Sequence, residues 1–224
     1  MEAAAAAGGR LAEAEALSWR EGATERTLRR DGRRWSAWTA WVLFVFITPG
    51  ALLLAIEPWT FPAALICFAH AYAVPRIQAS RGARSPVAIG SARSASRAGD
   101  ADERAERVAL GLLGDLLGHE SRELVARSGL ALERGRLGVW LLGEQGAILV
   151  RPGGRRAFCW CVRIAQPEEL PAGDRVAHLL LALREDEEGF ATVANLQFSG
   201  ATWRVRRRMD ERSRAALDAA RAAR

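Results

Sequence analysis

The side chains that most often perform chemistry in proteins are few in this chain and stand far apart. Its three histidines, His70, His119 and His178, fall in three different predicted elements, and none stands in a ligand-spaced pair. All 32 basic residues are arginine, so the chain has neither a lysine nucleophile nor the lysine of a phosphate-binding loop. We therefore expect no catalytic residue, no cofactor and no metal ligand, and we interpret the protein as a non-enzyme.

Two short motifs carry a chemical alternative. Cys159 and Cys161 are two residues apart on a predicted strand, so they share one face of it. Without a second pair or a nearby histidine, this spacing favours small buried residues over zinc ligands. Residues 152–156 (PGGRR) resemble an anion-binding loop, but they separate two predicted strands instead of preceding a helix, which favours a hairpin turn.

The excess of arginine is concentrated in one segment. The formal net charge is +6, and residues 76–99 carry five arginines and no acid. Residues 100–224 carry twenty arginines and nineteen acids, so this part is close to neutral. A nucleic-acid-binding domain usually has a basic face of its own, and the distribution therefore argues against nucleic acid as a partner. Basic residues beside an apolar segment are typical of a membrane topology signal.

Two apolar runs separated by a short turn predict a transmembrane hairpin of two helices over residues 37–75. The first, 37–56, holds no charge and spans about 30 Å, the thickness of the hydrocarbon core. The second, 59–74, reaches about 24 Å and needs flanking residues or a thinner bilayer. Interfacial rings are expected to anchor the pair, namely Trp35, Trp38, Trp41, Trp59 and Tyr72.

Arginines set the expected orientation of this hairpin. They precede the first helix and follow the second, and the turn at Glu57-Pro58 has none. Positively charged flanks stay inside, so both termini are predicted to be cytoplasmic, with the protein a multi-pass component of a bacterial inner (plasma) membrane. The chain then divides into a cytoplasmic tail (1–36), the hairpin (37–75), a basic flexible linker (76–100) and a cytoplasmic domain (101–224).

The cytoplasmic domain is predicted to be α+β, with about five antiparallel strands and flanking helices. Residues 137–142, 147–151 and 155–164 form a predicted meander, because short glycine-bearing loops separate them. A second hairpin is expected from residues 190–198 and 201–208. Helical periodicity predicts helices over 102–117, 120–127, 175–187 and 210–223, with a strand as the alternative for 175–187.

One row of arginines has a chemical direction. Arg204, Arg206 and Arg208 alternate along the predicted last strand, so they would project from one face toward lipid phosphates or an acidic partner. The structural alternative is an edge strand that charge protects from pairing. Linker arginines beside the membrane would attract anionic headgroups too. The candidate binding residues are therefore Arg204, Arg206, Arg208, Arg76, Arg81 and Arg84.

Two stretches of sequence resemble known families. The runs 175–186 (RVAHLLLALRED) and 189–196 (GFATVANL) resemble two-span membrane proteins of high-GC Gram-positive bacteria, a group that brings no function with it. Residues 106–109 (ERVA), opening a helix before a meander, resemble the nuclease-related domain family. That resemblance would imply a metal-dependent nuclease with an acidic-x-Lys motif, and this chain has no lysine and no acid inside its middle strands.

The sequence thus predicts a membrane-anchored module that binds a protein partner or anionic lipid headgroups. One alternative is a membrane-tethered hydrolase or nuclease-like enzyme whose site is not recognised, acting on a lipid-linked substrate or nucleic acid. A third hypothesis is a small pore or transporter accessory subunit. That hypothesis requires a homo-oligomer, because two spans cannot enclose a path alone.

Overall fold

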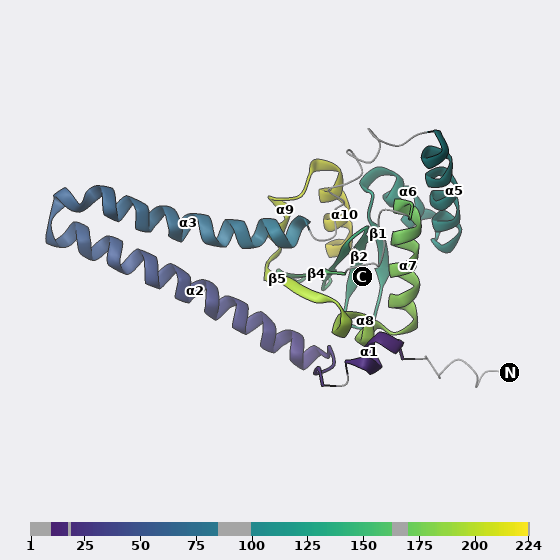
Figure 1. Cartoon of the computed structure of the whole chain (residues 1–224), viewed down its shortest axis with the longest axis horizontal. Coiled ribbons are helices and arrows are strands. Elements are labelled where there is room, and N and C mark those ends of the chain that lie inside the picture. The colour runs from purple at the N-terminus through teal and green to yellow at the C-terminus, as the bar shows by residue number, and fades with distance from the viewer. Residues whose placement is uncertain (1–9, 18, 85–99, 163–169, 224) are drawn as a thin grey trace.

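The computed structural model describes residues 10–17, 19–84, 100–162 and 170–223. Two long helices, α2 (Glu25–Ile56) and α3 (Phe61–Arg84), project side by side from an α+β body (Figure 1). The short 3-10 helix η1 (Pro58–Thr60) lies in the turn between them. One described helix, α2, is long and apolar enough to cross a membrane.

The body is built on one antiparallel sheet of five strands, in the order β1-β2-β3-β4-β5. The predicted α+β class and the predicted meander are therefore confirmed, although β1 was not predicted. The strands are β1 (Ala131–Arg134), β2 (Val139–Gly143), β3 (Gly146–Val150), β4 (Arg156–Cys161) and β5 (Asn195–Ala201). Strand β5 pairs with β4, with a register shift between Cys159 and Trp160.

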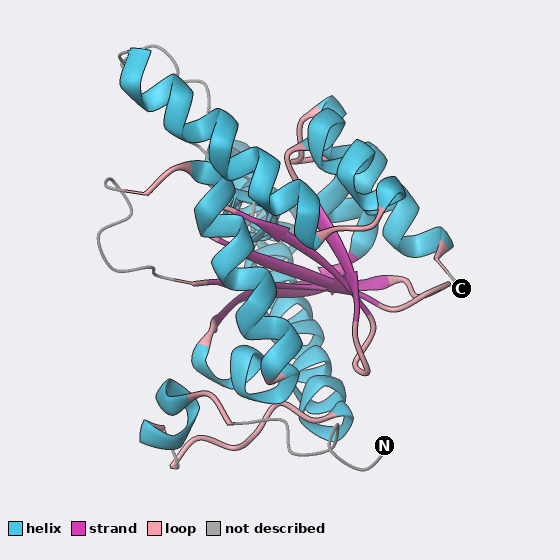
Figure 2. Ribbon diagram, turned by 90° about the vertical axis from the view of Figure 1, so that its right-hand side faces the viewer, coloured by secondary structure: helices cyan, strands magenta, loops and turns pink. Residues whose placement is uncertain are grey.

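Helices cover both faces of this sheet, as Figure 2 shows. Alternate residues of the strands enter two separate cores, because successive side chains of a strand point to opposite faces. Trp140, Leu149 and Phe158 lie in the core under α7 and α8, whereas Leu141 and Ile148 lie in the core that includes α10. The apolar character of both strand faces follows from this double coverage.

The helices of the body largely follow the predicted ranges. Residues 172–185 are helical, which confirms the predicted helix there and excludes its strand alternative. In α5, Leu113 is buried, and so is Leu117, which follows the last residue of the helix, whereas Val108 and Leu112 are exposed. The helices are α1 (Ala12–Ala16), α5 (Asp100–Leu116), α6 (His119–Ser128), α7 (Ala172–Glu185), α8 (Glu187–Val193), α9 (Thr202–Arg206) and α10 (Glu211–Ala222).

The predicted hairpin of residues 190–198 and 201–208 is wrong. Residues 187–193 form α8, whose start is capped by Asp186 as its carboxylate accepts the backbone N–H of Gly189 at 2.8 Å. Residues 202–206 form α9, with Thr202, Val205 and the following Met209 buried. That burial repeats every three to four residues, which is the period of a helix and not of a strand.

Both long helices extend beyond the apolar segment, which corrects the predicted tail and linker. Helix α2 begins at Glu25, and α3 continues through Pro75 to Arg84. Leu28 is buried in one core of the body, and Ala79 and Ala83 are buried in the other. The body therefore includes parts of both long helices, so the predicted domain boundary near residue 100 does not separate two folding units. Residues 85–99 of the predicted linker lie outside the described part of the chain.

Small residues allow α2 and α3 to pack closely. Gly50 and Ala64 are buried between the two helices, and a Cβ atom on Gly50 would lie 3.0 Å from the ring of Phe68. Pro49, although it lacks an N–H group, stays inside the continuous helix α2. Close contact through small residues is the usual way in which helices associate inside a membrane.

The segment before α2 is held against α8. The Arg20 guanidinium donates to the carbonyl of Thr192 at 2.9 Å, and the Ala23 amide donates to the Thr192 hydroxyl at 3.1 Å. The Leu11 amide donates to Asp186 at 3.3 Å. These contacts attach Leu11, Arg20 and Ala23 to the body just before α2 begins.

Candidate functional site

Helix α9 positions a group of arginines beside α3. Arg204 on α9 lies together with Arg207 and Arg208 in the turn that continues from it, because residues three and four apart share a face there, whereas the predicted strand would have grouped Arg204, Arg206 and Arg208. The predicted row is therefore wrong in its geometry, and Arg207 replaces Arg206. The signal that could have shown this was the spacing of the apolar residues Val205 and Met209.

Arg206 points to a different partner. Its guanidinium donates to the carboxylate of Asp218 on α10 at 2.9 Å, so its charge is paired within the body. This hydrogen bond raises the pKa of Arg206 and lowers the pKa of Asp218. Arg206 therefore belongs to the contact between α9 and α10 and not to the candidate site.

Arg204 is the most buried member of the group. It donates to the carbonyl of Pro75 on α3, and its guanidinium carbon lies 5.3 Å from the centre of the Phe198 ring. Burial lowers the pKa of Arg204, because removing a charge from water disfavours the charged form. Arg204 thereby joins α9, α3 and β5 at one point.

Arg76 and Arg207 each lie over an aromatic ring. Arg76 is 4.4 Å from the ring centre of Tyr72, one turn earlier on α3, and Arg207 is 5.6 Å from that of Trp203. Such contacts hold a guanidinium group in place and leave its N–H donors open to an anion. Arg76, which belongs to the predicted linker, lies next to α9. The structure therefore brings together arginines from both predicted groups, the linker and the last predicted strand.

An apolar groove of about 590 Å³ connects these arginines with the space beside α2 and α3. Its α2 wall carries Thr39, Leu43 and Ile47, and its α3 wall includes Phe68 and Tyr72. Helix α9 contributes Trp203 and Arg204, and the turn after it contributes Arg207 and Arg208, with Arg76 and Pro75 also at this end. The groove therefore has an apolar side along both long helices and a cationic end.

The other predicted residues take different places. Arg81 and Arg84 are exposed in the last turn of α3 and do not line the groove. Trp35, which was predicted to anchor the chain at the membrane interface, is partly buried and packs against the body. Trp38, Trp41, Trp59 and Tyr72 are exposed on the long helices and their turn.

No catalytic arrangement is apparent in the described part of the chain. Within it, no three His, Cys, Asp or Glu residues form a group that could hold a metal ion. Cys159 is buried, and this burial raises the pKa of its thiol. Cys161 lies on the same strand, and both cysteines are free.

One ion pair in the body is largely shielded from water. The guanidinium of Arg175 on α7 lies 2.7 Å from the carboxylate of Glu144, which follows β2, and the two side chains are 11% and 8% exposed. Burial raises the pKa of Glu144 more than Arg175 lowers it, and Glu106 raises it further. The pair joins α7 to the β2–β3 turn, which is a structural role.

Comparison with known proteins assigns this chain to no family. No protein-family model matches the chain. No curated protein and no solved structure matches it either.

Proposed function

We propose that this protein is a membrane-anchored module that binds an anionic phospholipid at the cytoplasmic face of the membrane. In this proposal α2 and α3 form a hairpin that spans the bilayer, and the groove beside α9 holds the lipid. The observation that carries the proposal is the groove itself, because it joins an apolar wall to a cluster of arginines in the way that a phospholipid joins its chains to its phosphate.

The surface of the two long helices supports their insertion into a membrane. Large apolar side chains are exposed along them, including Phe44 (59%), Leu65 (54%) and Trp59 (88%). Soluble monomers seldom expose a continuous apolar surface of this extent, whereas lipid tails would cover it. The uncharged part of α2, residues 37–56, has the length of the hydrocarbon core at about 30 Å.

The distribution of charge supports an orientation with both termini in the cytoplasm. The first four turns of α2 carry five arginines, Arg26, Arg29, Arg30, Arg33 and Arg34, and α3 ends with Arg76, Arg81 and Arg84. In the turn at the far end of the helices, the only charged residue is Glu57. Because arginine-rich flanks remain on the cytoplasmic side, the body would lie there as well.

The groove would then cross the inner surface of the membrane. Thr39, Leu43 and Ile47 follow one another within the uncharged part of α2, where acyl chains would surround them. Arg76 marks the end of the uncharged part of α3, at the level of the phosphates. A chain of a lipid could therefore lie against the apolar wall while its headgroup meets the arginines.

The charge at this end of the groove is not neutralised by any carboxylate in the part of the chain that the structure describes. In the described residues, no carboxylate pairs with Arg76, Arg204, Arg207 or Arg208. Basic residues near an anionic surface each contribute about 1 kcal/mol of attraction. The site should therefore prefer an anionic headgroup over a zwitterionic one.

The test compares lipid retention by the full-length protein in mild detergent. The protein is mixed with equal amounts of phosphatidylglycerol and phosphatidylcholine, and native mass spectrometry measures which lipid stays bound. We expect selective retention of phosphatidylglycerol and loss of that selectivity in the double variant R207Q/R208Q. Both arginines are exposed, so the body should still fold.

A matched double variant controls for net charge. R107Q/R212Q also removes two exposed arginines, but from α5 and α10, away from the groove. It should retain phosphatidylglycerol as the native protein does. Equal retention of the two lipids by the native protein, or unchanged selectivity in R207Q/R208Q, would overturn the proposed site.

A further inference from the structure

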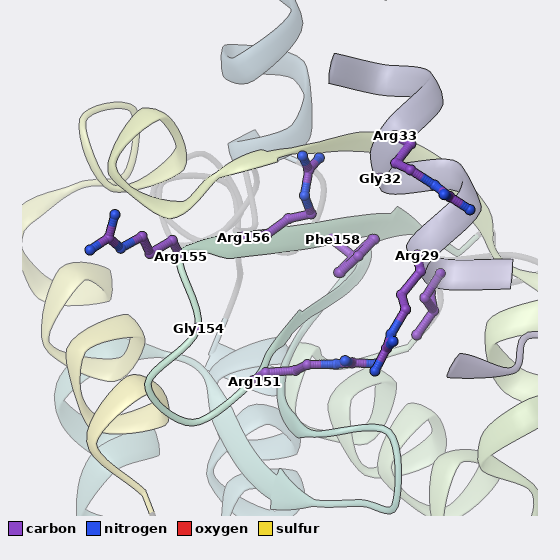
Figure 3. A pocket seen from close by; sticks show the side chains of 9 residues that line it. Arg29, Gly32, Arg33, Arg151, Gly154, Arg155, Arg156 and Phe158 are labelled. Atoms are coloured by element: carbon purple, nitrogen blue, oxygen red, sulfur yellow. The ribbon is translucent and has the colours of Figure 1, made fainter. Parts of the chain in front are cut away.

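A second cavity lies on the body at the start of α2, away from the groove. It has a volume of about 470 Å³ and is lined by residues of α2, the β3–β4 turn and β4 (Figure 3). Its apolar lining includes Leu28 and Phe158, and five arginines surround it. These are Arg29, Arg33, Arg151, Arg155 and Arg156.

One carboxylate partly neutralises these five charges. Glu25 on the first turn of α2 accepts from Arg29 at 2.6 Å and from Arg151 at 3.0 Å. In Figure 3 the side chains of Arg29 and Arg151 extend toward each other from opposite sides of the cavity. The hydrogen bond from Arg29, followed by the charge of Arg151, lowers the pKa of Glu25. Glu25 therefore remains ionised. It accepts hydrogen bonds from two guanidinium groups, those of Arg29 and Arg151, that a ligand would also use.

Arg156 is fixed in the wall without a carboxylate. Its guanidinium donates to the hydroxyl groups of Ser36 and Ser199, and burial lowers its pKa. A Cβ atom on Gly32 would lie 3.1 Å from its side chain, so this glycine leaves room for it against α2. The structure pairs no acid with Arg33, Arg155 or Arg156 among the residues that it describes.

The chemistry of the wall selects a phosphate ligand. A guanidinium group has planar, paired N–H donors that match phosphate oxygens, and several of them suit a ligand with several negative charges. The cavity has the size of sites for small molecules. Its α2 residues, 28–33, precede the uncharged segment that begins at residue 37, so in the proposed membrane arrangement the cavity would lie on the water side of the hydrocarbon core.

We infer that this cavity binds a water-soluble, multiply phosphorylated small molecule, with Arg29, Arg151 and Arg156 as its principal donors. The site is separate from the lipid groove and shares no residue with it. It places a soluble ligand on the same helix, α2, that lines the groove.

The experiment uses inorganic tripolyphosphate as the probe and the full-length protein in a zwitterionic detergent. Isothermal titration calorimetry measures affinity and stoichiometry. We expect one tripolyphosphate per chain, and the variant R151Q should bind about tenfold more weakly because one charge-assisted contact is lost. The variant R107Q, which removes an exposed charge from α5, should bind as the native protein does.

A variant of opposite effect separates recognition from misfolding. E25Q removes the carboxylate that competes for Arg29 and Arg151, so it should bind tripolyphosphate about two- to fivefold more tightly. A damaged fold would weaken binding instead. The lipid-site variant R207Q/R208Q should leave tripolyphosphate binding unchanged, which keeps the two sites distinguishable.

Three results would overturn the inference. The first is no binding of tripolyphosphate at millimolar concentration. The second is binding that neither R151Q nor E25Q alters. The third is that R151Q loses binding to vesicles of phosphatidylglycerol while tripolyphosphate binding stays the same, because the cavity would then hold a lipid headgroup and not a soluble phosphate.

Discussion

Trp35 of α2 meets Phe198 of β5 edge to face, with ring centres 5.7 Å apart and planes inclined at 61°. Phe198 also contacts α3, because it packs against Gly82, and it lies beneath Arg204 of α9. One buried ring on an edge strand therefore touches both long helices and the helix that carries the candidate site. The relative position of these three helices depends on this contact.

Substituting Gly82 with alanine should separate α3 from the sheet. A Cβ atom at this position would overlap the Cβ of Phe198, so the backbone of one of them must move. We expect a loss of about 1–3 kcal/mol in stability, typical of overpacking. Thermal unfolding in detergent, followed by tryptophan fluorescence, measures this loss.

The control for this variant is Gly111→Ala in α5. Nothing lies within 4 Å of a Cβ atom there, so the methyl group meets open space. Because alanine favours a helix over glycine by up to about 1 kcal/mol, G111A should match or exceed the native stability. Equal effects of G82A and G111A would contradict the close contact of α3 with β5.

Removing one partner of the buried pair Glu144–Arg175 should lower the stability of the protein more than removing both partners does. E144Q leaves the guanidinium of Arg175 in a shielded place without its counter-ion, and we expect a loss of about 3–5 kcal/mol. In the double variant E144L/R175M no buried charge remains, so most of this loss should be recovered. Urea unfolding of the native protein and the two variants makes the comparison, and a double variant less stable than E144Q would exclude this explanation.

The pair Arg206–Asp218 should give a small stability contribution that acid removes. The folded pKa of Asp218 is lowered by the hydrogen bond from Arg206, so the contribution is present above the unfolded pKa of about 3.9. It is lost as the pH falls through the folded pKa. Because both side chains are nearly half exposed, solvent screening keeps the effect small.

Unfolding of D218N and R206Q at pH 7 and at pH 3 measures this contribution. Both variants should be slightly less stable than the native protein at pH 7 and closer to it at pH 3. A difference that stays constant, or one that grows in acid, would show that packing and not the ion pair accounts for the effect.

The orientation of the hairpin can be measured in intact cells with an impermeant thiol reagent. A cysteine that replaces Pro58, in the turn between the long helices, should react from outside the cell. A cysteine that replaces the exposed Arg212 on α10 should react only after the membrane is opened. The reverse pattern would invert the proposed topology, and the native protein gives the background from its own three cysteines.

Sequence periodicity predicted most elements where one pattern was dominant. The meander β2–β4 was predicted because glycine-bearing turns separate short apolar runs, and α7 was predicted because Val176, Leu179, Leu180 and Leu183 share one helix face. Both faces of the sheet are covered, which agrees with the apolar residues on both faces of β4.

The errors occurred where tertiary contacts decide the structure. Arg204, Arg206 and Arg208 stand at every second position, which imitates a strand, but the burial of Val205 and Met209 against the sheet selects a helix. The second apolar helix was predicted over residues 59–74 and the hairpin ended at residue 75, whereas packing of Ala79 and Ala83 on β5 and its neighbours extends α3 to Arg84. The arginine cavity at α2 was missed because its walls come from residues more than a hundred positions apart.

The burial of parts of α2 and α3 in the two cores of the body also has a consequence for how the protein is made. Leu28, Ala79 and Ala83 leave the ribosome before the sheet that they cover, and they lie on the two helices that we propose to span the bilayer. The strands would then assemble against helix ends already held at the membrane surface. Biogenesis of the body would therefore depend on prior insertion, and chains that miss the membrane would be left with exposed strands for quality-control proteases to remove.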